Sequence, residues 1–201
     1  MNMNTQNPAI VEMRRKAWAE LRRRVENCQK CTLCKTRKQI VLGEGTTENC
    51  RCVIIGEAPG ETEDEQGRPF VGDSGKLLRK ILNDCRIPRE KVYITNVLKC
   101  RPPHNRDPET PEMDACEEHL EAQLLLLQPD IVVTVGRIST QWLLKSTQTI
   151  SNIRGKWLDW RMIKLLPIFH PSYLLRSRNV AHLQLTYKDI YELKQALDRL
   201  Q

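Results

Sequence analysis

Four short apolar runs that alternate with helical patterns constrain the fold of this 201-residue chain more than any other feature. The first run, Arg51-Cys-Val-Ile-Ile55, has four apolar or cysteine residues out of five, which is typical of a strand buried on both faces. Three further strands are predicted at residues 91–98, 130–135 and 162–169. Strands that alternate with helices predict a mainly parallel sheet covered by helices on both faces. The predicted fold class is therefore α/β, a three-layer sandwich around a four-stranded, mainly parallel sheet.

Apolar residues at helical spacing predict the elements between the strands. Ser74 is placed at the N-cap of the second helix. The stretch 155–160 is predicted to be a hairpin or irregular. There is no internal repeat and no low-complexity segment, so residues 1–201 are interpreted as a single domain, with residues 1–8 expected to be flexible. The predicted helices span residues 10–28, 74–86, 111–127, 138–145 and 183–200.

Composition excludes several classes of protein. The longest apolar run, Leu124–Leu127, is far shorter than the roughly 18 residues that a membrane span needs, so we expect no membrane partner. The polar segment Met1–Ala9 lacks the apolar core of a signal peptide, and a cytoplasmic location is expected. Eight cysteines in a cytosolic chain indicate metal ligands or reduced thiols before disulfides. The net charge of +7 is compatible with a polyanionic partner.

Polar side chains of three different kinds follow the predicted strands. Glu57 comes soon after the first strand, Asn96 lies near the end of the second, and His170 follows the fourth. In open parallel sheets, function gathers just past the carboxyl ends of the strands. Taken singly, Glu57 could be a solvated carboxylate, Asn96 a turn residue and His170 a hydrogen-bonding loop residue. Their combination at one edge of the sheet predicts a functional site there.

A glycine-containing stretch, Gly72-Asp-Ser-Gly-Lys76, is only superficially similar to a phosphate-binding loop. Phe70 stands where the motif G-x-x-x-x-G-K-[ST] needs its first glycine, and Leu77 stands where it needs serine or threonine. The spacing therefore argues against a nucleoside triphosphatase.

Two pairs of cysteines are candidate metal ligands. Cys28 and Cys31 form a C-x-x-C motif, whereas Cys100 follows the second strand and Cys116 lies in the next helix. Four thiolates suit either a [4Fe–4S] cluster or a tetrahedral zinc ion, and the ligand count alone does not distinguish them.

The other four cysteines leave alternatives open. Cys34 extends the first motif to a second C-x-x-C, and Cys50 is a further candidate ligand. Cys52 and Cys85 lie at apolar positions of a strand and a helix, and we interpret them as core thiols. Cys116 also lies on an apolar helix face, so a core role stays open for it.

Together these residues resemble the family 4 uracil-DNA glycosylases, the iron–sulfur branch of the uracil-DNA glycosylase superfamily. Each matching motif is weak alone, but the set follows family order over nearly the whole chain and is highly specific as a set. The motifs are Cys28-x-x-Cys31, Gly43-Glu-Gly45, Gly56-Glu-Ala-Pro-Gly60, Gly67-Arg-Pro-Phe-Val-Gly72, Thr95-Asn-Val-Leu-Lys-Cys-Arg-Pro-Pro103, Arg154-Gly-Lys-Trp157 and His170-Pro-Ser-Tyr-Leu-Leu-Arg176.

The resemblance implies a metal centre as well as the sandwich fold. By position, Cys28, Cys31, Cys100 and Cys116 would hold a [4Fe–4S] cluster with a structural role. Zinc is the less favoured occupant of the same ligands. Cys34 is then an additional thiol beside the site, and its role is left open.

The resemblance also implies a monofunctional enzyme that hydrolyses the N-glycosidic bond of uracil in DNA. Such an enzyme starts base excision repair, flips the nucleotide out of the helix and leaves an abasic site. Phe70 is expected to stack on the base, Asn96 to read its N3 and O4 edge, and His170 to hydrogen-bond O2, where negative charge develops. The expected partner is single- or double-stranded DNA that contains uracil, bound by a monomer associated with the nucleoid.

Further positions have implied roles in handling water and DNA. Ala58 is a uracil-pocket residue at the position where a related family carries a water-positioning aspartate, so Glu57 or a backbone carbonyl is expected to hold the water instead. Leu174 is assigned to the minor groove as a wedge, with a core position as the alternative. Phosphate contacts are expected from Arg101, Arg106, Lys156, Arg176 and Arg178.

Two other functions account for part of the pattern. A protein that binds uracil-containing or damaged DNA without cutting it is compatible with Ala58, and release of free uracil distinguishes the two. A thiol redox or metal-relay protein would use the first three cysteines, but it leaves the candidate pocket residues without roles.

Overall fold

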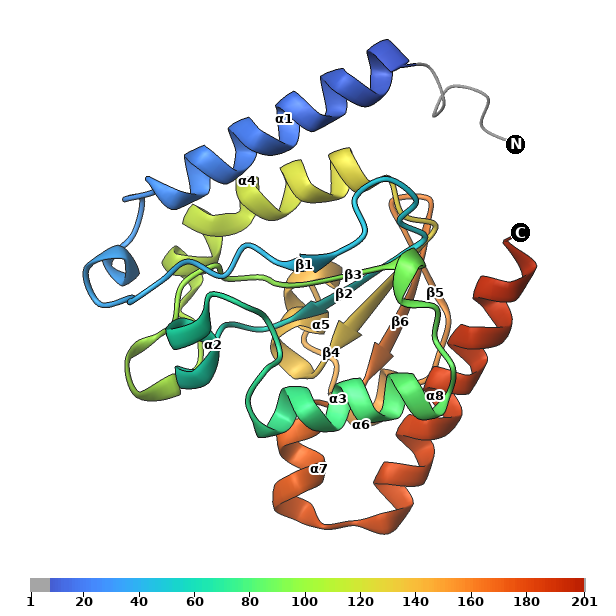
Figure 1. Ribbon diagram of the computed structural model, residues 1–201. Coiled ribbons are helices and arrows are strands. Elements are labelled where there is room, and N and C mark those ends of the chain that lie inside the picture. The colour runs from blue at the N-terminus through green and yellow to red at the C-terminus, as the bar shows by residue number, and fades with distance from the viewer. Residues whose placement is uncertain (1–7, 201) are drawn as a thin grey trace.

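The computed structural model describes residues 8–200, which surround one six-stranded sheet (Figure 1). The strand order is β1-β3-β2-β4-β6-β5. The prediction of a sandwich around a four-stranded, mainly parallel sheet is confirmed by the central strands. These parallel strands are β3 (Val92–Asn96), β2 (Cys52–Gly56), β4 (Ile131–Val135) and β6 (Ile163–Ile168).

Two short antiparallel strands extend the sheet at its edges. β1 (Glu44–Gly45) pairs with β3, and β5 (Leu158–Trp160) pairs with β6. The hairpin expected near residues 155–160 is formed by β5 and β6, and Arg161 and Met162 both have positive φ in its two-residue turn, as a primed turn requires. Strands of two or three residues are too short to show a periodic pattern, so β1 is not predicted and β5 is expected only as part of a hairpin.

Helices cover both faces of the sheet (Figure 1). Three-residue and four-residue 3₁₀ turns lie at Thr32–Lys35, Arg89–Lys91 and Pro103–Asn105. No helix within residues 8–200 is long and apolar enough to cross a membrane. The helices are α1 (Pro8–Glu26), α2 (Glu61–Gln66), α3 (Asp73–Asp84), α4 (Thr110–Leu127), α5 (Arg137–Leu144), α6 (Ile150–Ile153), α7 (Pro171–Ser177) and α8 (Val180–Arg199).

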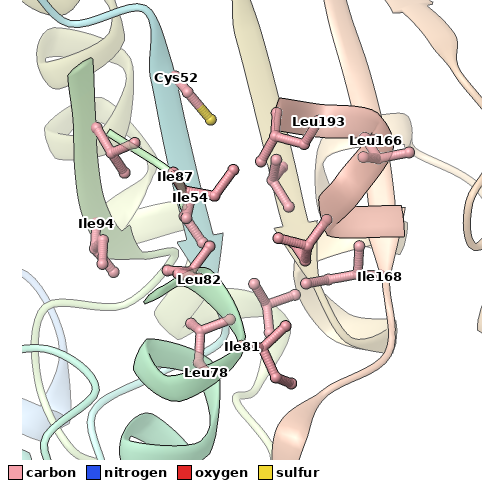
Figure 2. Close-up of a cluster of buried hydrophobic side chains, with 14 of the residues drawn as sticks. Cys52, Ile54, Leu78, Ile81, Leu82, Ile87, Ile94, Leu166, Ile168 and Leu193 are labelled. Atoms are coloured by element: carbon pink, nitrogen blue, oxygen red, sulfur yellow. The ribbon is translucent and has the colours of Figure 1, made fainter. Parts of the chain in front are cut away.

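The core divides into two clusters because alternate residues of each central strand point to opposite faces. Ile54 and Ile168 face α3 and α8, where they pack against Leu78 and Leu193 in the cluster of Figure 2. Val53 and its neighbours on the other face pack against α4 and α5. Cys52 is fully buried in the first cluster, and Cys85 is half-buried against it, so both interpretations as core thiols are confirmed.

Three helix starts differ from the sequence-based expectation. Ser74 is not an N-cap, because Gly72 holds that position and α3 begins at Asp73. No helix is predicted between residues 145 and 183, yet α7 forms there: His170 caps its start, and Pro171 occupies the first turn, where a missing N–H is harmless. Pro8 begins α1, and the remaining residues of the segment expected to be flexible, 1–7, lie outside the described part.

Candidate active site and cysteine cavity

A cavity of about 550 Å³ lies at the carboxyl ends of the parallel strands. Its walls include all five residues that the sequence pointed to for base binding and chemistry. The expected meeting of carboxylate, amide and imidazole at one edge of the sheet is therefore observed. These residues are Glu57, Ala58, Phe70, Asn96 and His170.

Strand pairing brings the first two loops of the cavity together. Gly56 and Asn96 are register partners at the ends of β2 and β3. Beyond the strands, the Val97 N–H donates to the Gly56 carbonyl at 2.9 Å, and the Leu98 N–H donates to the Glu57 carbonyl at 3.0 Å. The ladder thus continues past the formal strand ends and holds Glu57 beside Asn96.

The Phe70 ring reaches the cavity because two glycines leave room for its backbone and for its ring. Phe70 has φ of 52°, in the left-handed region, and its backbone passes so close to Gly75 that a Cβ there would collide with it. Gly56 is equally constrained, since a Cβ at that position would meet both the Phe70 ring and the Asn96 side chain. Phe70 is 6 % exposed, and its ring centroid lies 6.4 Å from that of His170.

Two charged side chains that the sequence reasoning missed hold this turn. Glu63 accepts hydrogen bonds from the N–H groups of Val71 at 2.8 Å and Gly72 at 2.7 Å. Arg79 donates to the Phe70 carbonyl at 2.9 Å. Glu63 and Arg79 lie in helical segments, where their spacing looks like that of ordinary surface charges, so the sequence contained no signal for their roles.

The carboxamide of Asn96 faces the cavity without a protein partner. The residue is 2 % exposed, yet its side chain forms no hydrogen bond with any residue of the described range 8–200. Its oxygen and nitrogen are not among the buried unpaired side-chain atoms of the described residues, so they are open to the cavity. Asn96 therefore has both a donor and an acceptor available to a bound molecule.

His170 is held in one orientation by the start of α7. Its Nδ1 accepts a hydrogen bond from the Ser172 N–H at 3.2 Å and lies 2.7 Å from the Ser172 hydroxyl. Burial lowers the pKa of His170 to about 4, and the nearby Arg176 adds to that shift. At neutral pH the ring is therefore uncharged, and with Nδ1 as an acceptor its proton is on Nε2.

Glu57 lies in the cavity wall, where the pKa of its carboxyl group differs from the usual value. Burial raises the pKa of Glu57 to about 7; Asp107 raises it further, and Arg137 opposes the shift. Its carboxylate forms no hydrogen bond with the described residues, so it is available to water in the cavity.

Leu174 does not occupy the position of a wedge. It is 5 % exposed and belongs to the core cluster under α7, as in the alternative considered from the sequence. Its neighbours Tyr173 and Leu175 are 36 % and 44 % exposed. The assignment to Leu174 fails because α7 is a helix whose inward face contains that residue.

The five candidate phosphate-binding cations fall into two groups. Arg101 pairs with Glu61 at 3.2 Å, and Arg106 pairs with the buried Glu112 at 2.6 Å. The other three side chains form no ion pair with any residue between 8 and 200, and one of them also lines the cavity. They are Lys156, Arg176 and Arg178.

A second, smaller cavity collects the cysteines of both predicted pairs. It is formed by the segment after α1, the segment after β3 and one face of α4. Cys34 also lines this cavity, so five thiols share it, and none forms a disulfide. Cys50 and Cys52 do not line it. The four predicted ligands are Cys28, Cys31, Cys100 and Cys116.

Two of these sulfur atoms have hydrogen-bonding partners, and Lys99 lies near a third. Burial raises the pKa of the Cys116 thiol to about 11, and Lys99 opposes that shift. Arg37 Nη1 donates to Cys100 Sγ at 3.1 Å, and His119 Nε2 lies 3.3 Å from Cys28 Sγ. Such donors stabilise sulfur in its anionic, metal-binding form.

Within residues 8–200, no three side chains of His, Cys, Asp or Glu converge as the ligands of a single metal ion do. A [4Fe–4S] cluster uses one thiolate for each of four iron atoms, so its ligands need not meet at one point.

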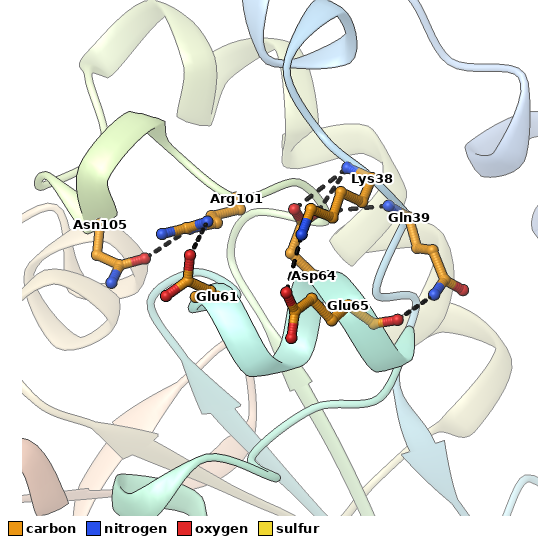
Figure 3. Close-up of polar contacts among 7 residues, drawn as sticks. All are labelled: Lys38, Gln39, Glu61, Asp64, Glu65, Arg101 and Asn105. Atoms are coloured by element: carbon orange, nitrogen blue, oxygen red, sulfur yellow. Dashed lines mark hydrogen bonds and ion pairs between the residues drawn. The ribbon is translucent and has the colours of Figure 1, made fainter.

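A network of polar contacts joins the segment after the cysteines to the first cavity (Figure 3). Asp64 on α2 accepts the N–H groups of Lys38 at 3.0 Å and Gln39 at 3.4 Å. Arg101, the residue after Cys100, donates to Asn105 Oδ1 at 2.7 Å. These contacts anchor α2, which follows the loop containing Glu57.

Comparisons with known proteins identify the family of this chain. Residues 42–191 match the family model described as the Uracil DNA glycosylase superfamily. A type-4 uracil-DNA glycosylase of Thermotoga maritima is 43 % identical over 85 % of this chain and 90 % of its own length. Proteins with the same description from Saccharolobus solfataricus and Sulfurisphaera tokodaii are 42 % and 40 % identical, over 86 % and 87 % of this chain and 83 % of each relative.

Proposed function

Because the chain belongs to the uracil-DNA glycosylase superfamily and to its type-4 family, we propose that it hydrolyses the N-glycosidic bond of uracil in DNA and so starts base excision repair. The observation that carries this proposal is one cavity in which an unpaired, buried carboxamide, an aromatic ring and a neutral imidazole meet. Its substrate brings the enzyme to DNA of the nucleoid, and one chain supplies the complete cavity.

The cavity suits a base that has left the helix. A base inside a duplex is out of reach, so the nucleotide must be flipped at a cost of a few kcal/mol. The Phe70 ring then stacks on the base, which adds affinity without choosing among bases. The side chain of Ala58 is small, so it leaves room in the cavity for the base.

Asn96 selects uracil. Its carboxamide oxygen accepts from N3–H, and its amide group donates to O4. Cytosine has the opposite polarity at both atoms, so it leaves two buried groups unpaired, each at about 1–3 kcal/mol.

His170 stabilises the departing base. Cleavage of the C1′–N1 bond sends its electron pair to uracil, and negative charge collects on N1 and O2. The neutral ring donates its Nε2 proton as a hydrogen bond to O2, and this bond strengthens as the charge develops. The ring stays neutral throughout, since its pKa is lowered to about 4.

Glu57 positions the attacking water below C1′, and the carboxylate takes up the proton that the water loses. The residual sugar is an abasic site. No lysine is among the residues that line the described cavity, and Lys99 is turned toward Thr95, which supports hydrolysis without strand cleavage.

DNA docks over the mouth of this cavity. The exposed side chains Tyr173 and Leu175 on α7 are positioned to fill the gap that the flipped nucleotide leaves, in place of Leu174. Lys156, Arg176 and Arg178 then contact phosphates, and each contact steepens the salt dependence of binding by roughly one ion.

Incubation with a labelled oligonucleotide that contains one uracil tests the proposal directly. We expect release of free uracil and a strand that breaks only after alkali treatment. Oligonucleotides with cytosine or thymine at the same position serve as controls. Tight binding without release of uracil would instead establish the non-cutting DNA-binding protein.

The excision rate should depend on pH through Glu57. Because burial raises the pKa of Glu57 to about 7, the carboxylate forms as the pH rises through 7. We therefore expect the rate to increase with pH up to about 7 and to stay constant at higher pH. Glu57→Gln should lower the rate at pH 8 by roughly 100-fold and remove the pH dependence. Single-turnover rates between pH 5.5 and 9 provide the measurement.

The raised pKa of Glu57 also affects the stability of the native state, which should decrease as the pH rises while the excision rate increases. A carboxyl whose folded pKa is raised stabilises the native state below its unfolded pKa and loses this contribution as the pH rises through about 7. Glu57→Gln should therefore raise Tm relative to the parent protein at pH 8 more than at pH 5. Equal changes at both values would contradict the assigned titration.

We further propose that Cys28, Cys31, Cys100 and Cys116 hold a [4Fe–4S] cluster. Four cavity thiols with neighbouring hydrogen-bond donors suit the cluster that the type-4 resemblance implies. The cluster, when bound, joins the segment after α1 to α4 and the end of β3. Its role would be structural, because no residue that lines the cysteine cavity also lines the cavity with Asn96.

Cysteine substitutions distinguish the proposed ligands from their neighbour. Anaerobically purified protein should be brown and contain about four irons per chain. Cys100→Ser should lose the visible absorbance and most of the iron, whereas Cys34→Ser, in the same cavity, should keep both. Loss of iron from Cys34→Ser but not from Cys100→Ser would overturn the ligand set, and zinc in a colourless protein would overturn the cluster.

A further inference from the structure

One short segment connects the two cavities. Asn96 lines the first, Cys100 lines the second, and only three residues separate them. The main chain between them is fixed on both sides, since Leu98 donates to the Glu57 carbonyl at 3.0 Å and the Lys99 carbonyl accepts from Val41 at 2.8 Å. A displacement of the main chain at Cys100 would therefore also displace the main chain at Asn96.

The Lys99 side chain is buried in this segment and turns back toward the strand end. It is 1 % exposed, and its Nζ donates to the Asn96 carbonyl at 2.7 Å and to Thr95 Oγ1 at 2.8 Å. A fully buried lysine is rare because several kcal/mol are lost when an ammonium leaves water. The Lys99 ammonium supplies two hydrogen bonds that a leucine or methionine could not supply.

The other end of Lys99 contacts the cysteine cavity. Lys99 lines this cavity beside Cys100 and Cys116. No carboxylate among the described residues pairs with its ammonium. Lys99 thus forms part of the wall of the cysteine cavity, while its side chain holds the carbonyl of the base-reading residue.

We propose that Lys99 is a positioning residue that couples the cysteine cavity to Asn96 and aims the Asn96 carboxamide at the bound base. The hydrogen bond from Nζ fixes the plane of the peptide that follows Asn96. Together with the bond from the Val97 N–H to the Gly56 carbonyl, this hydrogen bond restricts the backbone of Asn96, and with it the place of a carboxamide that has no partner of its own. The inference rests on the proposed base-reading role of Asn96.

Lys99→Met tests the coupling, because methionine fills a similar volume without the ammonium. We expect the iron content and visible absorbance to stay at the parent level. The excision rate under single turnover should fall about tenfold, free uracil should inhibit about tenfold more weakly, and the preference for uracil over cytosine should decrease. Lys164→Met, which removes an exposed lysine on the other side of the sheet, is the matched control and should leave all four quantities unchanged.

Each result of this experiment either supports or overturns the positioning role of Lys99. Parent-like uracil inhibition and selectivity in Lys99→Met overturn the positioning role. If that variant purifies without iron, Lys99→Arg retains the charge and is measured instead; iron retained with weakened uracil inhibition supports the role, and iron lost again assigns Lys99 to the cysteine centre alone. Absence of uracil release by the parent protein would refute the proposed function itself, which is a separate result.

Discussion

Replacing His170 by alanine is expected to lower the single-turnover rate of uracil excision by roughly 10²–10³-fold, the largest loss of rate among the substitutions considered. The imidazole donates to O2 at the point where charge develops in the transition state. Removing it takes away an interaction that is weak with the intact nucleotide and strong during bond cleavage. Substrate affinity should therefore change much less than the rate.

A second substitution controls for folding. His170 also caps α7 by accepting the Ser172 N–H, so alanine removes about 1 kcal/mol of stability as well as the catalytic hydrogen bond. Asparagine can supply the capping acceptor but is too short to reach O2. We expect His170→Asn to regain Tm and to stay as slow as His170→Ala; a rate within about threefold of the parent protein would exclude a role for the ring in stabilising the anion.

The choice of base should respond most strongly to Asn96→Asp. A carboxylate keeps the acceptor position but loses the amide donor, so it no longer matches O4 of uracil and can accept from the exocyclic amine of cytosine. Two mismatched buried groups at about 1–3 kcal/mol each correspond to a discrimination of about 2–6 kcal/mol. We expect the ratio of uracil to cytosine excision to fall at least about 30-fold, the ratio that 2 kcal/mol provides.

Matched oligonucleotides that differ only at the target base provide the measurement. Asn96→Ala is the control, because it removes donor and acceptor together. It should slow uracil excision without any gain on cytosine. Unchanged selectivity in Asn96→Asp would assign the reading of the base to another residue of the cavity.

Much of the fold follows from local patterns. Apolar runs such as Cys52–Ile55 identify strands buried on both faces, because only such strands tolerate apolar side chains at every position. Parallel strands place their carboxyl ends at one edge, so Glu57, Asn96 and His170 could be assigned to one site before any contact was known. The edge strand β1 and the helix α7 could not be predicted, since two to seven residues contain too little periodicity.

The supporting residues show where prediction from sequence ends. Glu63 holds the turn at Phe70, and Lys99 is enclosed between two cavities, yet in the sequence each is an ordinary charged residue. Their partners are contributed by other elements or by main-chain groups. A charged residue type favours the surface, and only the packing around it reveals that it is buried.

The sequence by itself determined the sandwich, the edge of the sheet at which the site lies, and the kinds of side chain in it, because strand pattern and motif order are local properties. Only the tertiary structure decided that both cysteine pairs share one cavity, that Leu174 faces the core while Leu175 faces solvent, and that the buried Lys99 bonds to the Asn96 carbonyl. The physical reason is that burial is a sum of contacts from elements far apart in the chain. Spacing defines the faces of a helix, but the elements that pack on it determine which face is covered.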